Sequence, residues 1–215
     1  TDPVNLNGTI SQFDLDDTLF QTLRTIDAWD LPTSDPKDLI CATINKHGDP
    51  LSFMTLRQAS FFNWLLASTE LIVVTARDRS EIKRVKLPFS SWQVLTHGAI
   101  ILNQDGELQA QWQQHMYSEL KPLQDKLNQL SQLFSKHSSN DNSHLKFTAH
   151  SDNFNNGTDD EKLVIYLAIK HAQKNHQALI ELAAQLPMLI RDFDKYFYLH
   201  VNANNLAILP HVVHK

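Results

Sequence analysis

A short run of four apolar residues, residues 71–74 (Leu-Ile-Val-Val), constrains the fold of this chain more than any other segment. The run is continuous rather than alternating, which is typical of a strand buried on both faces in a parallel sheet. It ends at Thr75, and residues 78–81 (Asp-Arg-Ser-Glu) then have the form of a helix capping box. A strand that leads directly into a helix predicts an α/β fold with a parallel sheet.

An acidic motif, residues 14–18 (Asp-Leu-Asp-Asp-Thr), follows a second predicted strand at residues 8–13. Asp14 and Asp16 are two positions apart, so in extended backbone both carboxylates can face one cleft. Open α/β sheets bind ligands at the carboxyl ends of their strands. Two neighbouring carboxylates favour a bound cation, and hard oxygen ligands suit Mg²⁺. One of them can also act as a nucleophile while its neighbour acts as acid and then base. The alternative interpretation is an acidic turn that caps the next segment.

Polar residues also follow the apolar run. The hydroxyl of Thr75, with backbone N–H groups at the start of the next helix, can form an anion site without glycine. Arg77 lies close by in the sequence and can help to bind an anion. The chain has five glycines, which are too far apart for a glycine-rich phosphate loop. The alternative is that Thr75 only ends the strand and that Arg77 is solvated.

The remaining pattern changes character near residue 112. The first part predicts strands and helices in α/β order, with a loop over residues 30–52. The second part predicts the order helix, strand, strand, helix, strand, strand, which is typical of a small α+β domain. The further predicted elements are helices at 55–67, 116–134 and 177–190, and strands at 92–95, 99–102, 145–150, 163–169, 196–201 and 206–209.

Composition excludes several classes of protein. The formal net charge is −5, so the chain has no basic footprint for nucleic acid. No segment approaches the ~20 apolar residues of a membrane-spanning helix. The single cysteine, Cys41, excludes an intrachain disulfide and a multi-cysteine zinc site, and suits a reducing compartment. The N-terminal residues do not have the form of a signal peptide. We therefore expect a cytoplasmic protein without nucleic-acid or membrane partners.

The two motifs together resemble those of the haloacid dehalogenase superfamily of phosphohydrolases. Residues 13–20 resemble its first motif, an apolar strand followed by D-x-D-x-T. Residues 71–78 resemble its second, an apolar strand that ends in Thr or Ser. Residues 96–103 resemble the third core strand of the Cof-like and sucrose-phosphatase-like branch.

The resemblance also implies how the chain is organised. It implies a Rossmann-like parallel-sheet core in residues 1–111, interrupted by a class-two α+β cap in residues 112–209. Residues 210–215 would then return to the core. The family's fourth motif, which supplies further acids, is not among the 215 residues, and we expect the remaining core strands beyond Lys215.

The resemblance implies a role for each matched residue. Asp14 would be the nucleophile and a Mg²⁺ ligand, and Asp16 would be the acid and base and would offer its backbone carbonyl to the Mg²⁺. Thr75 would hold phosphate oxygens, with Arg77 beside it, and Lys215 would offset negative charge. These roles imply a Mg²⁺-dependent phosphomonoesterase that acts through an aspartyl-phosphate on a small phosphorylated metabolite such as a sugar phosphate.

Three other functions remain open at this stage, of which one is a purely structural or partner-binding module. A phosphomutase would use the same acids with a sugar bisphosphate as activator. A phosphate-ligand binding protein without turnover would explain the missing fourth motif. The sequence does not indicate an oligomeric state.

Overall fold

The computed structural model describes residues 10–28, 38–138, 144–154, 162–189, 191–202 and 205–214. The chain divides into two compact units, Thr1–Gln109 and Ala110–Lys215. Helices and a sheet with parallel strands confirm the predicted α/β class. The division lies close to the boundary predicted at residue 112, whereas the roles of the units as core and cap stay a prediction.

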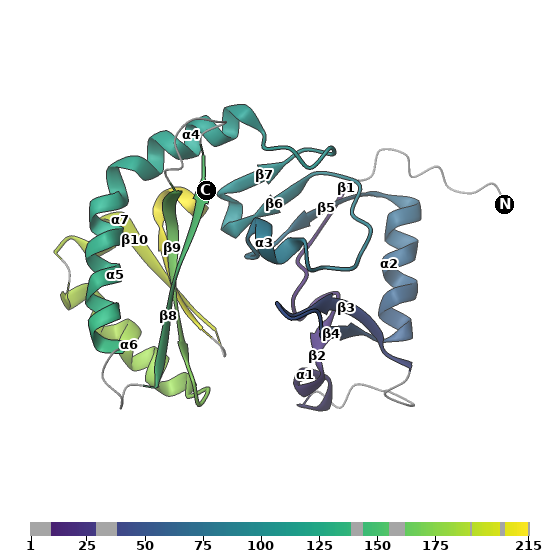
Figure 1. Cartoon of the computed structure of the whole chain (residues 1–215), viewed down its shortest axis with the longest axis horizontal. Coiled ribbons are helices and arrows are strands. Elements are labelled where there is room, and N and C mark those ends of the chain that lie inside the picture. The colour runs from purple at the N-terminus through teal and green to yellow at the C-terminus, as the bar shows by residue number, and fades with distance from the viewer. Residues whose placement is uncertain are drawn as a thin grey trace. The chain divides into compact units, whose positions relative to one another are not determined.

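The first unit contains a four-stranded sheet in the order β1-β5-β6-β7. Its strands are β1 (Ile10–Phe13), β5 (Glu70–Val74), β6 (Gln93–Leu95) and β7 (Ile100–Leu102). β1 pairs in parallel with β5, and β5 pairs in parallel with β6 (Figure 1). β5 is therefore an interior strand with a neighbour on each side. Leu71 and Val73 are buried, whereas Ile72 and Val74 on its other face are only partly buried, so the predicted burial on both faces is not complete.

β7 corrects the prediction for residues 96–103. The resemblance predicts that this segment supplies the third core strand, but β6 is the third parallel strand and β7 runs antiparallel to it. Residues 96–98 form a tight turn between β6 and β7, which reverses the chain direction. After β7, Asn103 and Glu107 are hydrogen-bonded across the predicted Asp-Gly turn, and Leu102 bridges to Leu108.

A second, three-stranded antiparallel sheet lies in the segment predicted as a loop. Its order is β2-β4-β3, and its strands are β2 (Gln21–Thr22), β3 (Ile40–Ile44) and β4 (Pro50–Met54). The loop prediction for residues 30–52 is thus wrong over β3 and the start of β4. The turn between these strands is built on Asn45, whose side chain accepts N–H bonds from His47 and Asp49, and on Gly48 with φ 91°. The helices α1 (Leu23–Ala28) and α3 (Arg79–Ile82) also belong to this unit.

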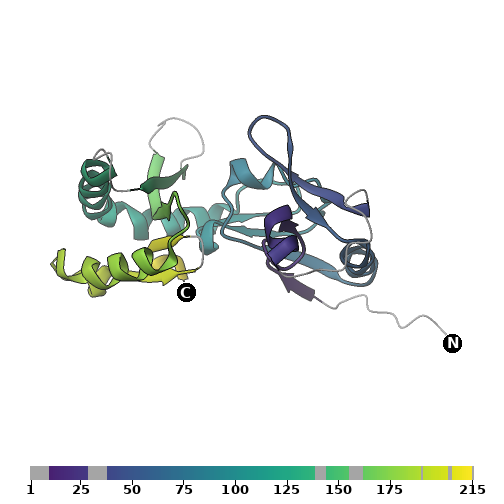
Figure 2. The same cartoon turned by 90° about the horizontal axis from the view of Figure 1, so that it is seen from below.

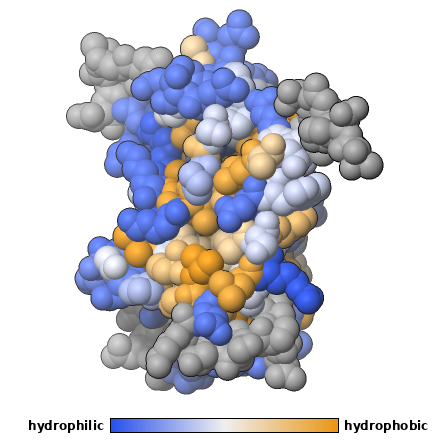
Figure 3. All heavy atoms as spheres, turned by 90° about the vertical axis from the view of Figure 1, so that its right-hand side faces the viewer, coloured by the Kyte–Doolittle hydropathy of each residue, from blue (hydrophilic) through white to orange (hydrophobic). Residues whose placement is uncertain are grey.

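Helix α2 (Leu56–Ser68) packs against β5 and begins at a capping box formed by Thr55 and Gln58. Its buried side chains recur at helical spacing: Ala59, Phe62 and Leu65. The opposite face of α2 carries Phe61 and Trp64, whose rings stack with centroids 5.9 Å apart. Trp64 is 54% exposed. Figure 3 faces the side on which α2 lies, and it shows apolar surface there among polar groups.

The second unit is a four-stranded antiparallel sheet with helices along one face. The sheet order is β10-β11-β9-β8, with β8 (Leu145–Asn153), β9 (Lys162–His171), β10 (Phe197–Val201) and β11 (Leu206–Pro210). Helices α5 (Gln124–Ser138) and α6 (His176–Leu189) lie along the same face (Figures 1 and 2). Side chains of both helices and of β9, β10 and β11 form one buried apolar cluster, which we call the unit-2 core. The element order agrees with the α+β prediction.

Two of the predicted helices in this unit contain a proline, and only one of them is interrupted by it. The helix predicted at 116–134 is interrupted, because Pro122 lies in a short 3-10 turn (Lys121–Leu123) between α4 (Ala110–Leu120) and α5. Pro187, in contrast, lies inside α6 near its end and does not stop that helix.

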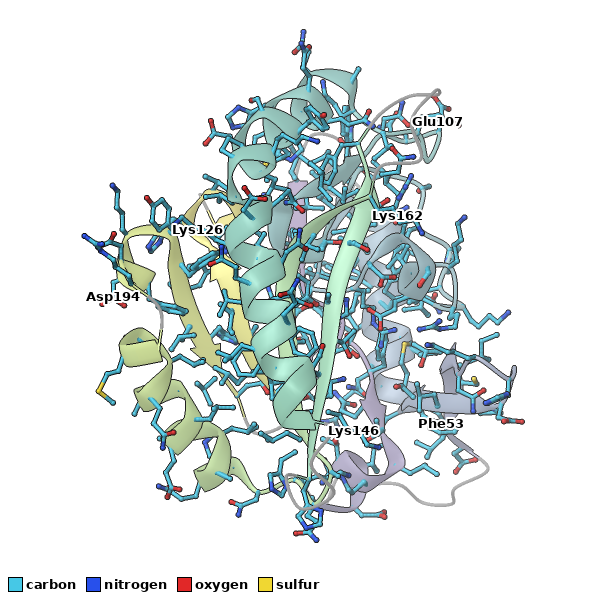
Figure 4. The ribbon with its side chains drawn as sticks, turned by 60° about the vertical axis from the view of Figure 1, so that its left-hand side comes forward. Phe53, Glu107, Lys126, Lys146, Lys162 and Asp194 are labelled. Carbon is cyan, nitrogen blue, oxygen red and sulfur yellow. The ribbon has the colours of Figure 1, made fainter. Side chains whose placement is uncertain are left out.

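The short helix α7 (Phe193–Tyr196) leads directly into β10. Lys126 on α5 extends its ammonium group to 4.3 Å from the centroid of the ring of Tyr196 on α7, and Asp194 lies on the same short helix (Figure 4). Among the described residues, no helix is both long and apolar enough to cross a membrane.

Candidate active site

The acidic motif and the Thr75 segment leave adjacent strands at the same edge of the sheet. β1 and β5 are parallel, and Phe13, the last residue of β1, pairs with Val73. Asp14 therefore follows one strand and Thr75 the other at neighbouring positions of the sheet edge. This is the edge at which open α/β sheets bind their ligands.

Apolar residues anchor the loop that carries the acids. Leu15 is fully buried, and its carbonyl accepts backbone N–H bonds from Leu19 (3.0 Å) and Phe20 (3.3 Å). Asp14 and Asp16, on either side of Leu15, both retain exposed surface. Alternation around one buried leucine thus places the two acids on the outer side of the loop. Asp17 follows with φ 57°, a left-handed conformation that aspartate tolerates better than most residues.

Asp14 has an unusual electrostatic setting. One of its carboxylate oxygens accepts a hydrogen bond from the N–H of Leu15 at 2.8 Å. Desolvation by the surrounding chain raises the pKa of Asp14 above its ordinary value, and the charge of Asp16 raises it further, against the opposing effect of the Leu15 bond. The carboxylates of Asp14 and Asp16 are therefore electrostatically coupled, as the sequence predicts for acids two positions apart.

Thr75 is buried and fixed by the sheet. Its N–H donates to the carbonyl of Val94 at 2.9 Å, and its Oγ1 accepts the N–H of Arg77 at 3.3 Å. A hydroxyl that accepts from the backbone still has its proton to donate. Thr75 can thus offer a hydrogen bond to an anionic oxygen, as predicted.

The helix that follows uses two of its first N–H groups for its own cap. Asp78 caps α3 with its own side chain, which accepts the N–H groups of Ser80 and Glu81 at 2.8 Å each. The sequence predicts the capping box itself, but this box occupies two of the N–H groups that the predicted anion site requires. Positive charge at this edge comes instead from Arg77.

Arg77 and Asp16 form a bidentate ion pair across 61 residues of sequence. The distances are 2.8 Å from Nε to Oδ2 and 2.6 Å from Nη2 to Oδ1. The guanidinium also lies over the ring of Phe20, 5.4 Å from its centroid. Burial alone would lower the pKa of Arg77, but the hydrogen bonds and charge of Asp16 outweigh it and hold that pKa above its usual value. We call this the Asp16–Arg77 pair.

Thr96 and Phe20 also contact Arg77, and the sequence pattern alone does not identify either as a site residue. Thr96 donates its N–H to the carbonyl of Arg77 at 3.0 Å, although its φ of 53° is strained for a β-branched residue. Phe20 supplies the ring beneath the guanidinium. The position of Phe20 at the end of the acidic motif is visible in the sequence, but no local pattern joins Thr96 to Arg77.

The predicted metal ligands fit Mg²⁺ better than a more demanding ion. The carboxylate of Asp14 and the backbone carbonyl of Asp16 are hard oxygen donors, and Mg²⁺ takes one or two carboxylates while it keeps several waters. Within the part of the chain that the structure describes, no group of three or more His, Cys, Asp or Glu residues could hold a metal ion. A structural zinc site, which needs four protein ligands, is therefore not formed by these residues. Lys215 lies outside the described residues.

Solved structures with a similar fold are phosphatases and related hydrolases. The chain is similar to a trehalose-6-phosphate phosphatase related protein, with a TM-score of 0.50, 12% identity, and coverage of 95% of this chain and 69% of the other. It is also similar to the C-terminal domain of C. albicans trehalose-6-phosphate phosphatase, with a TM-score of 0.53, 12% identity, and coverage of 96% and 59%. A haloacid dehalogenase-like hydrolase from Bacteroides thetaiotaomicron aligns with a TM-score of 0.42, 10% identity, and coverage of 95% and 72%.

These likenesses show that the chain shares its fold with the two structures related to trehalose-6-phosphate phosphatase. The chain spans 69% of the first of these two structures and 59% of the second. No family model and no curated protein matches the sequence.

Proposed function

We propose that the chain is a phosphomonoesterase that acts on a small phosphorylated metabolite, because its motifs resemble those of the haloacid dehalogenase superfamily and its fold is similar to that of the two structures related to trehalose-6-phosphate phosphatase. The observation that carries the proposal is the shared sheet edge of Asp14 and Thr75, with Arg77 hydrogen-bonded to Thr75. A nucleophile, a hydroxyl donor and a guanidinium at one edge are the groups that phosphoryl transfer uses. We extend the proposal to sugar phosphates because trehalose-6-phosphate phosphatases are among the similar structures.

Each residue has one task in the proposed reaction. An oxygen of Asp14 attacks phosphorus while the bond from phosphorus to the alcohol oxygen breaks, and Asp16 gives its proton to that oxygen. Asp16 then takes a proton from water, whose oxygen attacks the aspartyl-phosphate and releases phosphate from Asp14. Thr75 and Arg77 hold the phosphoryl oxygens, and Lys215 is proposed to offset their charge.

Mg²⁺ is the proposed cofactor, held by Asp14 and Asp16. When bound, it would neutralise charge on the phosphoryl oxygens. We place the protein in the cytoplasm, since its one cysteine suits a reducing compartment.

The decisive experiment is hydrolysis of an aryl phosphate by the natural full-length protein, with and without Mg²⁺. Asp14→Asn should reduce turnover to background, because the amide is not a nucleophile toward phosphorus. Asp16→Asn should lower kcat by roughly 10²- to 10⁴-fold, the usual contribution of a general acid and base. Asp17→Asn is the matched control, because it removes the same charge from the next residue. Turnover that survives Asp14→Asn would contradict the assigned nucleophile.

A phosphate-binding protein without turnover is the second candidate. It is favoured by the Asp16–Arg77 pair, in which the proposed acid and base has both oxygens engaged. It predicts that wild-type protein binds inorganic phosphate but releases no product from an aryl phosphate or a panel of sugar phosphates. Product formation by the wild type excludes this candidate.

A further inference from the structure

The Asp16–Arg77 pair joins two residues that the proposed function uses separately, and the inference below rests on that function. In the reaction Asp16 exchanges protons with the leaving alcohol and with water, whereas Arg77 holds phosphoryl oxygens. In the structure both oxygens of Asp16 accept hydrogen bonds from Arg77. A general acid or base must reach the reacting oxygen itself, directly or through one water. The arrangement in the structure is therefore a resting one.

The two partners of the pair are held very differently. The Arg77 side chain is only 13% exposed and lies over Phe20, and the backbone of Arg77 is bonded to Thr75 and Thr96. The Asp16 side chain is 50% exposed. Arg77 is thus fixed by several neighbours, while Asp16 can turn into solvent without disturbing the core. When an anion competes for the guanidinium, Asp16 is the partner that moves.

We propose that the Asp16–Arg77 pair is an intramolecular latch that a phosphoryl group opens. A guanidinium binds carboxylate and phosphate through the same fork of N–H donors, so the two anions compete for Arg77. Phosphate that takes Arg77 releases the Asp16 carboxylate, which can then take a proton from the phosphate monoanion and pass it to the leaving alcohol. Without phosphate, Asp16 is an internal competitor that lowers the apparent affinity of the site. Substrate binding and the freeing of the acid are therefore one event.

The latch is tested by the affinity for inorganic phosphate, measured by calorimetry in the presence of a chelator. Asp16→Asn removes the competing charge and should bind phosphate about three- to tenfold more tightly than wild type. Asp17→Asn removes the same charge from the next residue, whose backbone N–H donates to the carbonyl of Phe20. This control should change the affinity less than about twofold, as expected for an exposed charge in salt.

Arg77→Lys tests whether Asp16 and phosphate compete for the guanidinium of Arg77. Lysine keeps the positive charge but not the bidentate fork. When Arg77→Lys is already present, Asp16→Asn should raise the affinity for phosphate no more than Asp17→Asn does. The latch is wrong if Asp16→Asn raises the phosphate affinity of the wild type no more than Asp17→Asn does. It is also wrong if Asp16→Asn still raises that affinity in a protein that carries Arg77→Lys. A failure of all the variants to bind phosphate would contradict it as well.

A spectroscopic measurement on wild-type protein does not depend on any variant folding correctly. The Nε–H resonance of Arg77 reports the bond to Asp16, so it should shift when phosphate is added. An unchanged resonance at saturating phosphate would overturn the proposal. Aryl phosphate hydrolysis is measured in parallel. Turnover without the affinity pattern overturns the latch alone, whereas the affinity pattern without turnover supports the latch and overturns the phosphatase.

Discussion

At the scale of single residues, Asp14 couples the proposed chemistry to the stability of the fold. Desolvation and the neighbouring charge of Asp16 raise its pKa above the ordinary value of 3.8. Between those two pKa values the folded chain binds more protons than the unfolded chain. The free energy of unfolding therefore falls as pH rises through this window, and the destabilisation is complete above the raised pKa of the folded state.

Asp14→Asn should for this reason stabilise the protein at pH 7 when metal is chelated. Asparagine cannot ionise, but its oxygen can still accept the N–H of Leu15. The gain in unfolding free energy should shrink as pH falls and vanish only well below the ordinary pKa of 3.8, where the wild-type acid is protonated in both states. Urea denaturation at several pH values measures it. Asp105→Asn, in an exposed turn, is the control, and an equal gain at pH 4 and pH 7 would contradict the argument.

The sequence is informative about individual site residues but not about their pairing. Asp14, Asp16 and Thr75 can be located because each follows a strand whose apolar residues are adjacent in the sequence. Arg77 can be named as an anion ligand from its place after Thr75. Its bond to Asp16 crosses 61 residues, and such a contact depends on how two strands pair, which no local pattern encodes.

At the scale of elements, α2 is tied to the sheet beside it through its first turn. Thr55 and Gln58 form a reciprocal capping box, with 2.9 Å from the N–H of Thr55 to Gln58 Oε1. The amide of Gln58 also donates to the side chain of Gln21 on β2 at 2.9 Å, and Gln21 is buried. One cap thus orders a helix start and a buried polar contact between elements.

Thr55→Ala should lower the free energy of unfolding by about 1 kcal/mol, because the Gln58 N–H loses its side-chain acceptor. Thr55→Ser keeps the hydroxyl and should recover most of that loss. Urea denaturation of both variants against wild type measures the difference. Equal losses for alanine and serine would show that the methyl group, and not the cap, stabilises this turn.

Elements are predictable from the sequence where the periodicity is strong and local. The apolar run at β5 and the helical spacing in α2 are enough to identify both elements. The sequence does not predict β3 and β4, because prolines and Gly48 indicate a loop. In the structure Gly48 lies in the turn between the strands and Pro50 is the first residue of β4, and the two strands are stabilised by pairing with each other. The break at Pro122 escapes prediction because the apolar spacing continues across it, from Leu120 to Leu127.

At the scale of the whole molecule, each unit has its own buried core. The unit-2 core contains fully buried residues such as Leu130 on α5 and Leu167 on β9. The first unit buries Phe62 and Leu65 of α2, which packs on a separate sheet. Units with separate cores are expected to respond separately to core substitutions.

Leu130→Ala and Leu65→Ala test that expectation as a matched pair. Each removes a buried leucine and should cost about 2–5 kcal/mol in its own unit. Calorimetry should show two transitions, of which Leu130→Ala lowers one and Leu65→Ala the other. A single transition that both variants lower equally would show that the units unfold as one.

The turn at residues 96–98 has a consequence for engineering. Thr96, His97 and Gly98 have consecutive positive φ values of 53°, 56° and 91°. Glycine adopts such values without strain, but for other residues the left-handed region costs roughly 1–2 kcal/mol each. The buried hydroxyl of Thr96 also lacks a hydrogen-bond partner among the described residues. Replacement of Thr96 is therefore expected to raise the free energy of unfolding. A library of variants for thermal stability would best begin at this position.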